Sequence, residues 1–423
     1  MVLGALALRL VVVAVVYPDQ LNPRRDHWPF GYEVGRIARA IATGRGFSDP
    51  LFSETGPTAW MTPVYPGLVA GVFKLFGIYT ETSALVLLSL NSLFSAMTCL
   101  PIFFVARQSF GPRVALWASW IWVVFPYAIY SSAALIWETC LTTLLLSLLF
   151  LATLRLERSP GLGRWAGFGL LWGLTALTDP VVLSVFPFLG GWACRGLRRR
   201  GQPWGLQAVV ATLALMAVVT PWFVRNYRTF HQFIPFRDAF GLVLWVGNNG
   251  DTSHWDVDSA HPSTSQAELD EYYRLGELRY MAHKRSQALD FISSHPGWFA
   301  RTTLRRILFT WTGFWSLDRR YLAEEPFDPP NIVLCTALTL LALAGLRYAF
   351  RESRAVAMPY AWVLLIFPAV YYITHNEVRY RHRIDPLLIV LATYAVIRLL
   401  SKKRVDEPSH PVVSTVTGAG SAG

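Results

Sequence analysis

The sequence predicts an all-α polytopic membrane protein with about ten transmembrane helices, and three observations lead to that fold class. Of the 423 residues, 53% are hydrophobic and only 15% are charged, whereas a soluble domain carries about a quarter charged residues. The apolar residues are gathered in long runs, and the basic residues stand between these runs. The apolar excess is therefore expected to contact lipid.

Ten apolar stretches come close to the roughly 20 helical residues that span the hydrocarbon core of a bilayer. The expected spans are 2–17, 83–106, 112–130, 133–154, 164–179, 181–195, 205–222, 331–349, 357–374 and 384–400. The first span contains Arg9 and is short. We expect either that the start of the sequence is truncated or that the long side chain of Arg9 reaches toward the interface. This first stretch has no small-residue cleavage site and does not read as a cleavable signal peptide.

Basic residues in the short loops indicate the orientation of the spans. The basic clusters are Arg107 with Arg113, 155–164, 195–200, 347–354 and 402–404, and all of them fall on one side of the predicted bundle. Both termini are therefore predicted to be cytoplasmic. The long loops 18–82 and 223–330 then lie on the opposite, extracytoplasmic side.

This pattern divides the chain into four predicted parts. Residues 1–222 form an N-terminal transmembrane module with its first outer loop at 18–82, and residues 223–330 form an extracytoplasmic helical segment. Residues 331–404 supply the C-terminal transmembrane helices. The polar tail 405–423 is predicted to be disordered and cytoplasmic.

Both outer loops contain stretches with helical spacing. "FGYEVGRIARAIATGRGFSDP" places Ile37, Ala38 and Ile41 on one face and predicts an amphipathic helix in the interface. "MTPVYPGLVAGVFKLFG", at 61–77, is too short for a span and predicts a second interfacial or re-entrant element. In 266–311, leucines and tyrosines recur at helical spacing among many charges, so we expect helices packed above the bundle.

Ionisable residues stand at the predicted outer ends of several spans, where a charge near lipid is costly. They are Glu138 in "ALIWETCL", Asp179 in "LTDP", Arg225 in "PWFVRNY", and Glu377, Arg379, Arg381 and Arg383 in "HNEVRYRHRIDP". Arginine matches phosphate oxygens with a fixed fork of donors, and a carboxylate can serve as a base. These residue types predict a cavity for a lipid-linked phosphate on the outer face.

Other ligand classes are less consistent with the sequence. The net charge is +11, but the basic residues form no continuous stripe, so no nucleic-acid partner is expected. The four cysteines lie in apolar segments without metal-ligand spacing, and the chain has neither an HxH nor an HExxH motif. His27, His231, His375 and His382 are scattered along the chain. We therefore expect no metal ion or other cofactor.

Six of these motifs together resemble the GT-C membrane glycosyltransferases, specifically the bacterial family 39, protein-mannosyltransferase-like branch that also contains the aminoarabinose transferases. The matching pieces, in chain order from about residue 9 to 400, are "YEVGRIARAIATGRGFS" with "TPVYPGLVAGVFKLFG", "IWETCLTTLLL", "GLTALTDP", "TPWFVRNYRTFHQFIPF", "LWVGNNG" and "VRYRHRIDPLLIVLATYAV". The resemblance implies that a sugar moves from a polyprenyl-phosphate donor to a lipid, glycan or protein acceptor by an inverting displacement. It also implies a multi-pass protein of a bacterial-type inner membrane, with the active site on the extracytoplasmic face.

The resemblance further implies an acidic base in the first outer loop, but the acidic pair usual in this family is missing here. Phe30 stands where the acid is expected, and Glu33 follows about one turn later. Glu33 is the preferred base, and Asp26 and Asp49 are the alternatives. Glu138 matches the family's acid at the outer end of the fourth span, whereas Asp179 departs from the basic residue usual before this proline.

The same resemblance assigns the binding of the donor phosphate. The expected residues are Arg225, Asn226, Tyr65, Asn248, Arg379, Arg381 and Arg383. One or two of the last three can instead pair with Glu377 or Asp385. We expect at least one of them to bind phosphate, and Arg381 or Arg379 is the better candidate. Two other interpretations remain open: a transporter or flippase of lipid-linked sugars, and a non-catalytic protein of cell-envelope assembly. The sequence shows no pair of related halves, which is the sign expected of many transporters.

Overall fold

The computed structural model describes the whole chain except residues 17–29, 251–259, 315, 320–321, 323–327 and 407–423. Helices dominate the described residues, and the only β contact among them is an isolated bridge between Ser48 and Pro57. The helices are α1 (Val2–Val16), α2 (Glu33–Ala42), α3 (Val64–Phe76), α4 (Glu81–Met97), α5 (Cys99–Phe110), α6 (Pro112–Val124), α7 (Pro126–Ala134), α8 (Thr139–Leu156), α9 (Leu162–Ala176), η2 (Pro180–Val185), α10 (Phe186–Arg199), α11 (Gly205–Phe230), α12 (Phe240–Gly247), α13 (Gln266–Leu275), α14 (Glu277–Ser294), α15 (Pro296–Thr312), α17 (Asp328–Glu352), α18 (Arg354–Ile366), α19 (Ala369–Ile373), α20 (Val378–His382) and α21 (Asp385–Asp406).

The predicted multi-pass architecture is confirmed, although the number of spans is not. Each of the ten predicted ranges contains helix. Within the described residues, six helical stretches are long and apolar enough to cross a bilayer, and the bent pair α6–α7 makes a seventh if it counts as one span. α1 and α9 have only 15 residues each, which is short for a span.

Large apolar side chains remain exposed along these helices. Examples on separate helices are Leu3, Trp117, Leu213 and Leu340, each at least 60% exposed. A contiguous apolar surface of this kind is unfavourable in water but is the normal lipid-facing surface of a membrane protein. The exposed side chains therefore agree with the apolar composition.

Arg9 is buried in the bundle, so the expectation that it reaches the interface is wrong. Its guanidinium donates to the carbonyl oxygens of Ala5, Val123 and Trp122, at 3.1, 3.1 and 3.2 Å, and to Ser95 Oγ at 2.9 Å. α6 and α7 meet at a 45° bend, where Pro126 has no N–H to continue the helical hydrogen bonds. Arg9 supplies donors to the carbonyls at this break.

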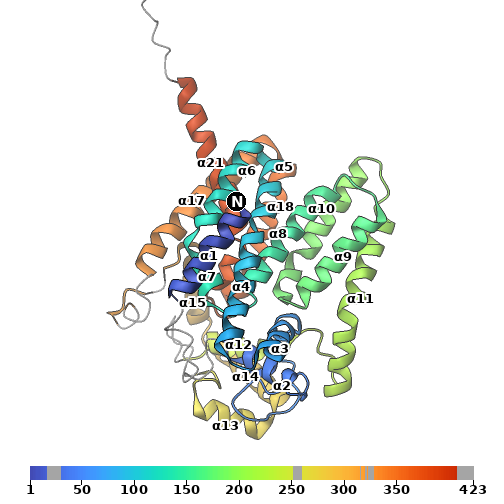
Figure 1. The fold of residues 1–423 in the computed structure, drawn as a ribbon, viewed down its shortest axis with the longest axis vertical. Helices are drawn as coiled ribbons and strands as arrows, with labels where there is room; N and C mark the ends of the chain where they lie inside the picture. Colours follow the sequence, from blue (N-terminus) through green and yellow to red (C-terminus); the bar gives the residue numbers. More distant parts are fainter. Residues whose placement is uncertain (17–29, 251–259, 315, 320–321, 323–327, 407–423) are drawn as a thin grey trace, which may run out of the picture.

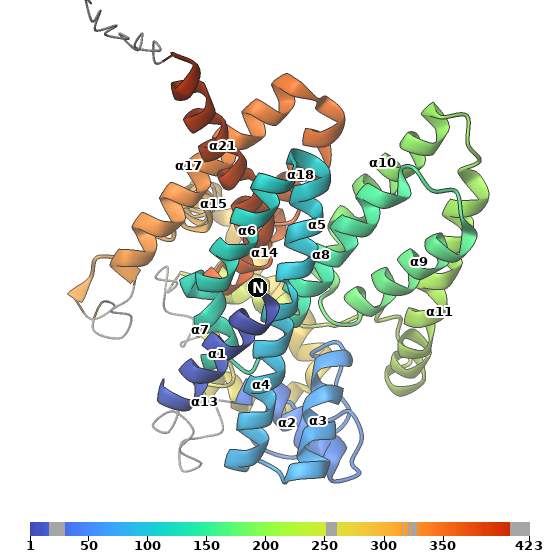
Figure 2. The same cartoon turned by 45° about the horizontal axis from the view of Figure 1, so that its top comes forward.

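A glycine allows α9 and α11 to pack closely. A Cβ atom placed on Gly169 of α9 would lie 2.0 Å from the carbonyl oxygen of Ala211 on α11. Small residues let helix backbones approach in this way within membranes. In Figures 1 and 2, α9, α10 and α11 form a wing beside the main bundle.

α2, α3 and α13 lie at one end of the molecule, and α21 extends from the opposite end (Figure 1). The predicted interfacial elements form helices α2 and α3. α2 is mostly buried against its surroundings, with only Arg39, Ile41 and Ala42 outside its buried set. It is therefore a packed structural element as well as an amphipathic one, and it positions the residues described next.

Candidate active site

Glu33 is the first residue of α2, and the turn before it holds it against the loop that carries Glu138. Gly31 has φ +70°, and a Cβ there would lie 2.4 Å from the carbonyl oxygen of Ile136. Only glycine combines this conformation with such a close approach. Tyr32 also has a positive φ, of 31°. The two residues 33 and 138 are therefore brought to the same region although 105 positions separate them.

The carboxyl group of Glu33 is buried, and both positively and negatively charged side chains influence it. Its residue is 7% exposed. Burial raises the pKa of Glu33 to about 7, against the attraction of Arg379 and Arg36, while the nearby Glu138 adds to the increase. A carboxyl group with a pKa near 7 can accept a proton close to neutral pH, which is the property required of a general base.

Glu138 belongs to a buried ion cluster that joins three segments of the bundle. Arg383 Nη2 lies 2.8 Å from Glu138 Oε1, and Arg383 Nη1 lies 2.9 Å from Asp179 Oδ2. The hydroxyl of Tyr371 also accepts from Arg383. Asp179 additionally accepts from the backbone N–H of Val181 and so caps η2. Arg383 thus balances two acids, and Glu138 Oε2 has no hydrogen-bond partner among the described residues.

Arg379 attracts the Glu33 carboxylate electrostatically and is held by Glu377. Arg379 Nη2 donates to Glu377 Oε1 at 2.9 Å, and its Nε lies 2.5 Å from Oε2. The guanidinium carbon is 4.3 Å from the ring centre of Trp137. Burial would raise the pKa of Glu377, but Arg379 and His375 outweigh it and lower that pKa to about 2. Glu377 is therefore ionised and fixes Arg379 in place.

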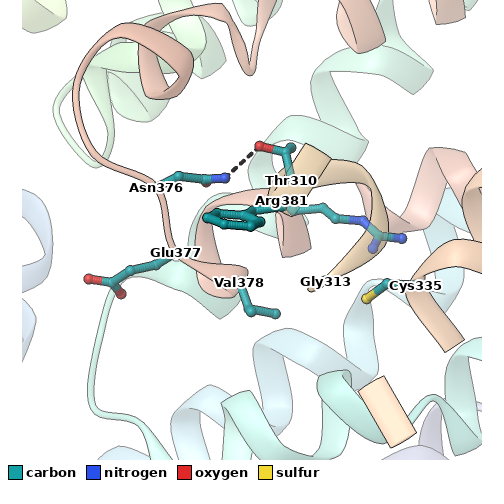
Figure 3. Close-up of a pocket in the computed structure, with 8 residues that line it drawn as sticks. Thr310, Gly313, Cys335, Asn376, Glu377, Val378 and Arg381 are labelled. Carbon is teal, nitrogen blue, oxygen red and sulfur yellow. Dashed lines mark hydrogen bonds between the residues drawn. The ribbon is translucent and has the colours of Figure 1, made fainter. Parts of the chain in front are cut away.

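Arg381 points away from this group. Its Nε is 3.2 Å from Asp385 Oδ1, and its three guanidinium nitrogens make no hydrogen bond to the described residues. Figure 3 shows its guanidinium directed toward Cys335, on the side of a small pocket opposite the Glu377 carboxylate. The structure therefore separates Arg381 from Arg379, although the sequence places them two residues apart.

The other four predicted phosphate-binding residues use their polar groups to hold loops and helices together. Arg225 donates to the carbonyl oxygens of Phe47 and Thr58, at 2.7 Å each. Asn226 donates to the carbonyl of Ile234, Asn248 to those of Leu244 and Ile373, and the Tyr65 hydroxyl to Asn91. Asn226 and Asn248 are 0% exposed and Tyr65 is 1% exposed. These contacts give each of the four a structural task.

Of the two alternative bases, the structure describes only Asp49. Asp26 lies outside the described residues. Asp49 is 2% exposed, accepts the backbone N–H groups of Thr55 and Gly56 at 2.9 Å each, and lies 3.0 Å from Arg45. These bonds explain Asp49 as the organiser of a turn. Of the two described acids, Glu33 is the one that Arg379 and Arg36 attract.

His261 is a member of the group that no sequence pattern indicated. It precedes α13, and its Nε2 lies 3.7 Å from Glu33 Oε1. A single histidine in a polar loop, 228 residues from its partner, has no spacing signal. Trp137, which stacks on Arg379, could have been noticed because it stands next to Glu138 in the sequence.

No family model matches the sequence, and no curated protein matches it either. Solved structures do match. The oligosaccharyltransferase AglB from Archaeoglobus fulgidus, in complex with an inhibitory peptide and a dolichol-phosphate, superposes with a TM-score of 0.55 at 15% identity, over 96% of this chain and 51% of that one. A second structure of the archaeal enzyme, in complex with Zn and sulfate, gives 0.54 at 16% identity, over 96% and 50%. This chain therefore shares the fold of the matched part of the archaeal oligosaccharyltransferase.

The chain spans about half the length of the archaeal oligosaccharyltransferase. ArnT from Cupriavidus metallidurans, bound to undecaprenyl phosphate, matches over 94% of this chain and 79% of that one, with a TM-score of 0.39 at 14% identity. A shared fold does not establish the chemistry, which has to be argued from the residues of this chain.

Among the described residues, no group of three or more histidine, cysteine, aspartate or glutamate side chains is arranged to hold a metal ion. Arg383 pairs with both Glu138 and Asp179. The charges that influence Glu33 are those of Arg379, Arg36 and Glu138.

Proposed function

We propose that this protein is an integral-membrane glycosyltransferase that moves a sugar from a polyprenyl-phosphate donor to an extracytoplasmic lipid, glycan or protein acceptor, with Glu33 as the base. The observation that carries the proposal is the buried Glu33 carboxyl, whose pKa burial raises to about 7 although Arg379 attracts the ionised form. A base and a guanidinium in one buried site are the two groups that transfer from a phosphate donor requires.

In the proposed step, the acceptor hydroxyl oxygen attacks the anomeric carbon of the donor sugar and forms the new glycosidic bond. The hydroxyl proton passes to Glu33. The bond between the anomeric carbon and the phosphate oxygen breaks, and its electron pair leaves with the polyprenyl phosphate. Attack and departure on opposite faces of the sugar invert the configuration at the anomeric carbon.

Arg379 is the residue that we propose for stabilising the leaving phosphate. Its guanidinium is fixed by Glu377 and by the ring of Trp137, so it is oriented before the substrate arrives. Donors arranged in advance stabilise developing negative charge more effectively than donors that must reorient. This assignment requires no metal ion and no other cofactor. Arg383 is already committed to two acids, and we propose that it holds Glu138 in place.

The test is sugar transfer from radiolabelled polyprenyl-phosphate sugars into membrane lipid and protein extracts, by the purified full-length chain in lipid vesicles. Glu33→Gln is expected to lower the rate by about a hundredfold or more, because the amide cannot accept the proton. Glu54→Gln is the matched control, since Glu54 lies in the same loop, is 80% exposed and pairs only with Arg45 among the described residues. It should leave the rate unchanged.

The pH dependence supplies a second readout. Glu33 must be deprotonated to act as the base, and its pKa is raised to about 7. The rate of the unaltered protein should therefore fall by about tenfold for each pH unit below 7. Equal rates for the unaltered protein and Glu33→Gln would move the base elsewhere. Transbilayer movement of a lipid-linked sugar without any glycosidic product would favour the flippase interpretation, and neither activity would favour a scaffold.

A further inference from the structure

His261 is held in a fixed position between the outer helices and Glu33. Its carbonyl oxygen accepts from the backbone N–H groups of Thr264 and Ser265, at 3.1 and 2.9 Å. Ser265 in turn begins α13 as its N-cap residue. The imidazole also makes an edge contact with the ring of Trp60. The loop geometry therefore fixes where the ring stands.

The hydrogen bonds of the ring determine which nitrogen carries the proton. The backbone N–H of Ser263 donates to His261 Nδ1 at 3.1 Å. The hydroxyl of Ser263 also lies 2.5 Å from Nδ1 and can donate or accept there. A backbone N–H can only donate, so we assign Nδ1 as the acceptor of the Ser263 N–H. In the neutral ring the proton is then on Nε2, which is the atom that faces Glu33 Oε1 at 3.7 Å.

The ring is neutral near pH 7. Burial, with a smaller contribution from His375, lowers the pKa of His261 to about 4. The other charged groups that influence Glu33 are Arg36 on α2, Arg379 on α20 and Glu138 before α8. His261 is thus an uncharged donor among charged side chains, and it cannot act as a base through Nε2.

We propose that His261 is a positioning residue for the base: its Nε2–H holds Oε1 of Glu33 and so presents Oε2 to the acceptor hydroxyl. The separation of 3.7 Å is slightly longer than a hydrogen bond. Hydrogen bonds at catalytic groups often shorten when the substrate binds. The proposal rests on the assignment of Glu33 as the base.

The test compares three substitutions that differ in where they place a donor. His261→Gln carries an amide N–H at nearly the position of Nε2, His261→Asn carries one near Nδ1, and His261→Ala carries none. If His261 orients Glu33, the alanine and asparagine variants should lower kcat by about tenfold to a hundredfold with little change in KM. The glutamine variant should restore most of the rate.

The pH profile distinguishes positioning from a purely structural role. A donor to the ionised carboxylate lowers its pKa, so removal of the donor should shift the acid limb of the rate profile to higher pH. His283→Ala is the matched control, because His283 Nε2 lies 3.5 Å from Glu271 Oε1 on the surface. It should change neither the rate nor the acid limb.

Two results would overturn the proposal. Rates and acid limbs equal to those of the unaltered protein in all three His261 variants would show that His261 does not orient Glu33. Failure of the glutamine variant to restore the rate, with a monodisperse and folded protein, would also contradict it. In both cases a strong loss with Glu33→Gln keeps the proposed base, whereas full activity of Glu33→Gln removes the base and the positioning role together.

Discussion

At the residue scale, buried and half-buried acids of the site pair with arginines. Arg383 pairs with Glu138 and Asp179, and Arg379 pairs with Glu377. A buried charge whose partner is removed costs several kcal/mol, because neither water nor an opposite charge compensates it. Burial, by contrast, is the largest influence on the pKa of Glu33, and it outweighs the attraction of Arg379 and Arg36.

Removal of Arg383 tests this matching. Arg383→Gln leaves Glu138 and Asp179 buried without their common partner, and should destabilise the protein by about 3–5 kcal/mol. Thermal unfolding in detergent measures the effect. Arg398→Gln is the control, since the Arg398 pair with Glu352 is largely exposed and should contribute about 0–1 kcal/mol. Similar losses for both variants would show that the buried cluster contributes no more to stability than the exposed pair does.

The ionisable residues at the outer ends of the predicted spans were sufficient to predict part of the site. The structure places Glu33, Glu138, Arg379 and Arg383 in one neighbourhood, as the sequence predicted, although their catalytic and binding roles remain predictions. Arg225 was predicted to bind phosphate because it ends a span, yet it donates to backbone carbonyls of the first outer loop. Composition does not reveal which partner a side chain will find.

At the element scale, broken helices and close helix pairs shape the bundle. Pro126 separates α6 from α7, and Arg9 donates to the carbonyls at the break. The sequence placed a single span at 112–130, because the apolar run is continuous there and only the local proline marks the bend. Gly169 and Ala211 bring α9 and α11 together on one side.

A glycine substitution tests the close helix pair. Gly169→Leu would force α9 from α11, because even a Cβ there would lie 2.0 Å from the carbonyl oxygen of Ala211. It should destabilise the protein by about 1–3 kcal/mol or more. Gly167→Leu is the matched control on the same helix, since a Cβ atom at that position would meet no atom of the described residues within 4 Å. Unfolding temperatures in detergent should fall only for the first variant.

At the scale of the whole molecule, the outer helices and the basic turns occupy opposite ends. α2, α3 and α13 lie at one end, and α21 extends from the other (Figures 1 and 2). The positive-inside rule then predicts that the end with α13 is extracytoplasmic and that both termini are cytoplasmic. The division into 1–222, 223–330, 331–404 and 405–423 likewise remains a prediction.

Cysteine labelling tests the orientation. Tyr273→Cys on α13 places a thiol at a position that is 42% exposed, and Arg351→Cys places one at an exposed position in the last turn of α17. A membrane-impermeant maleimide added to intact cells should label only the first variant, and the second only after permeabilisation. The reverse pattern would invert the topology and move the proposed site to the cytoplasmic face.

By itself, the sequence determined the membrane class, the approximate helix ranges and the acids and arginines that stand at span ends. Those properties depend on residue type and local spacing, because a bilayer selects apolar runs of a given length. Only the tertiary structure decided that Arg383 serves two acids, that Arg381 points away from the Glu377 carboxylate, and that His261 faces Glu33. Such contacts join residues far apart in the chain, so they depend on how the helices pack and not on any local pattern.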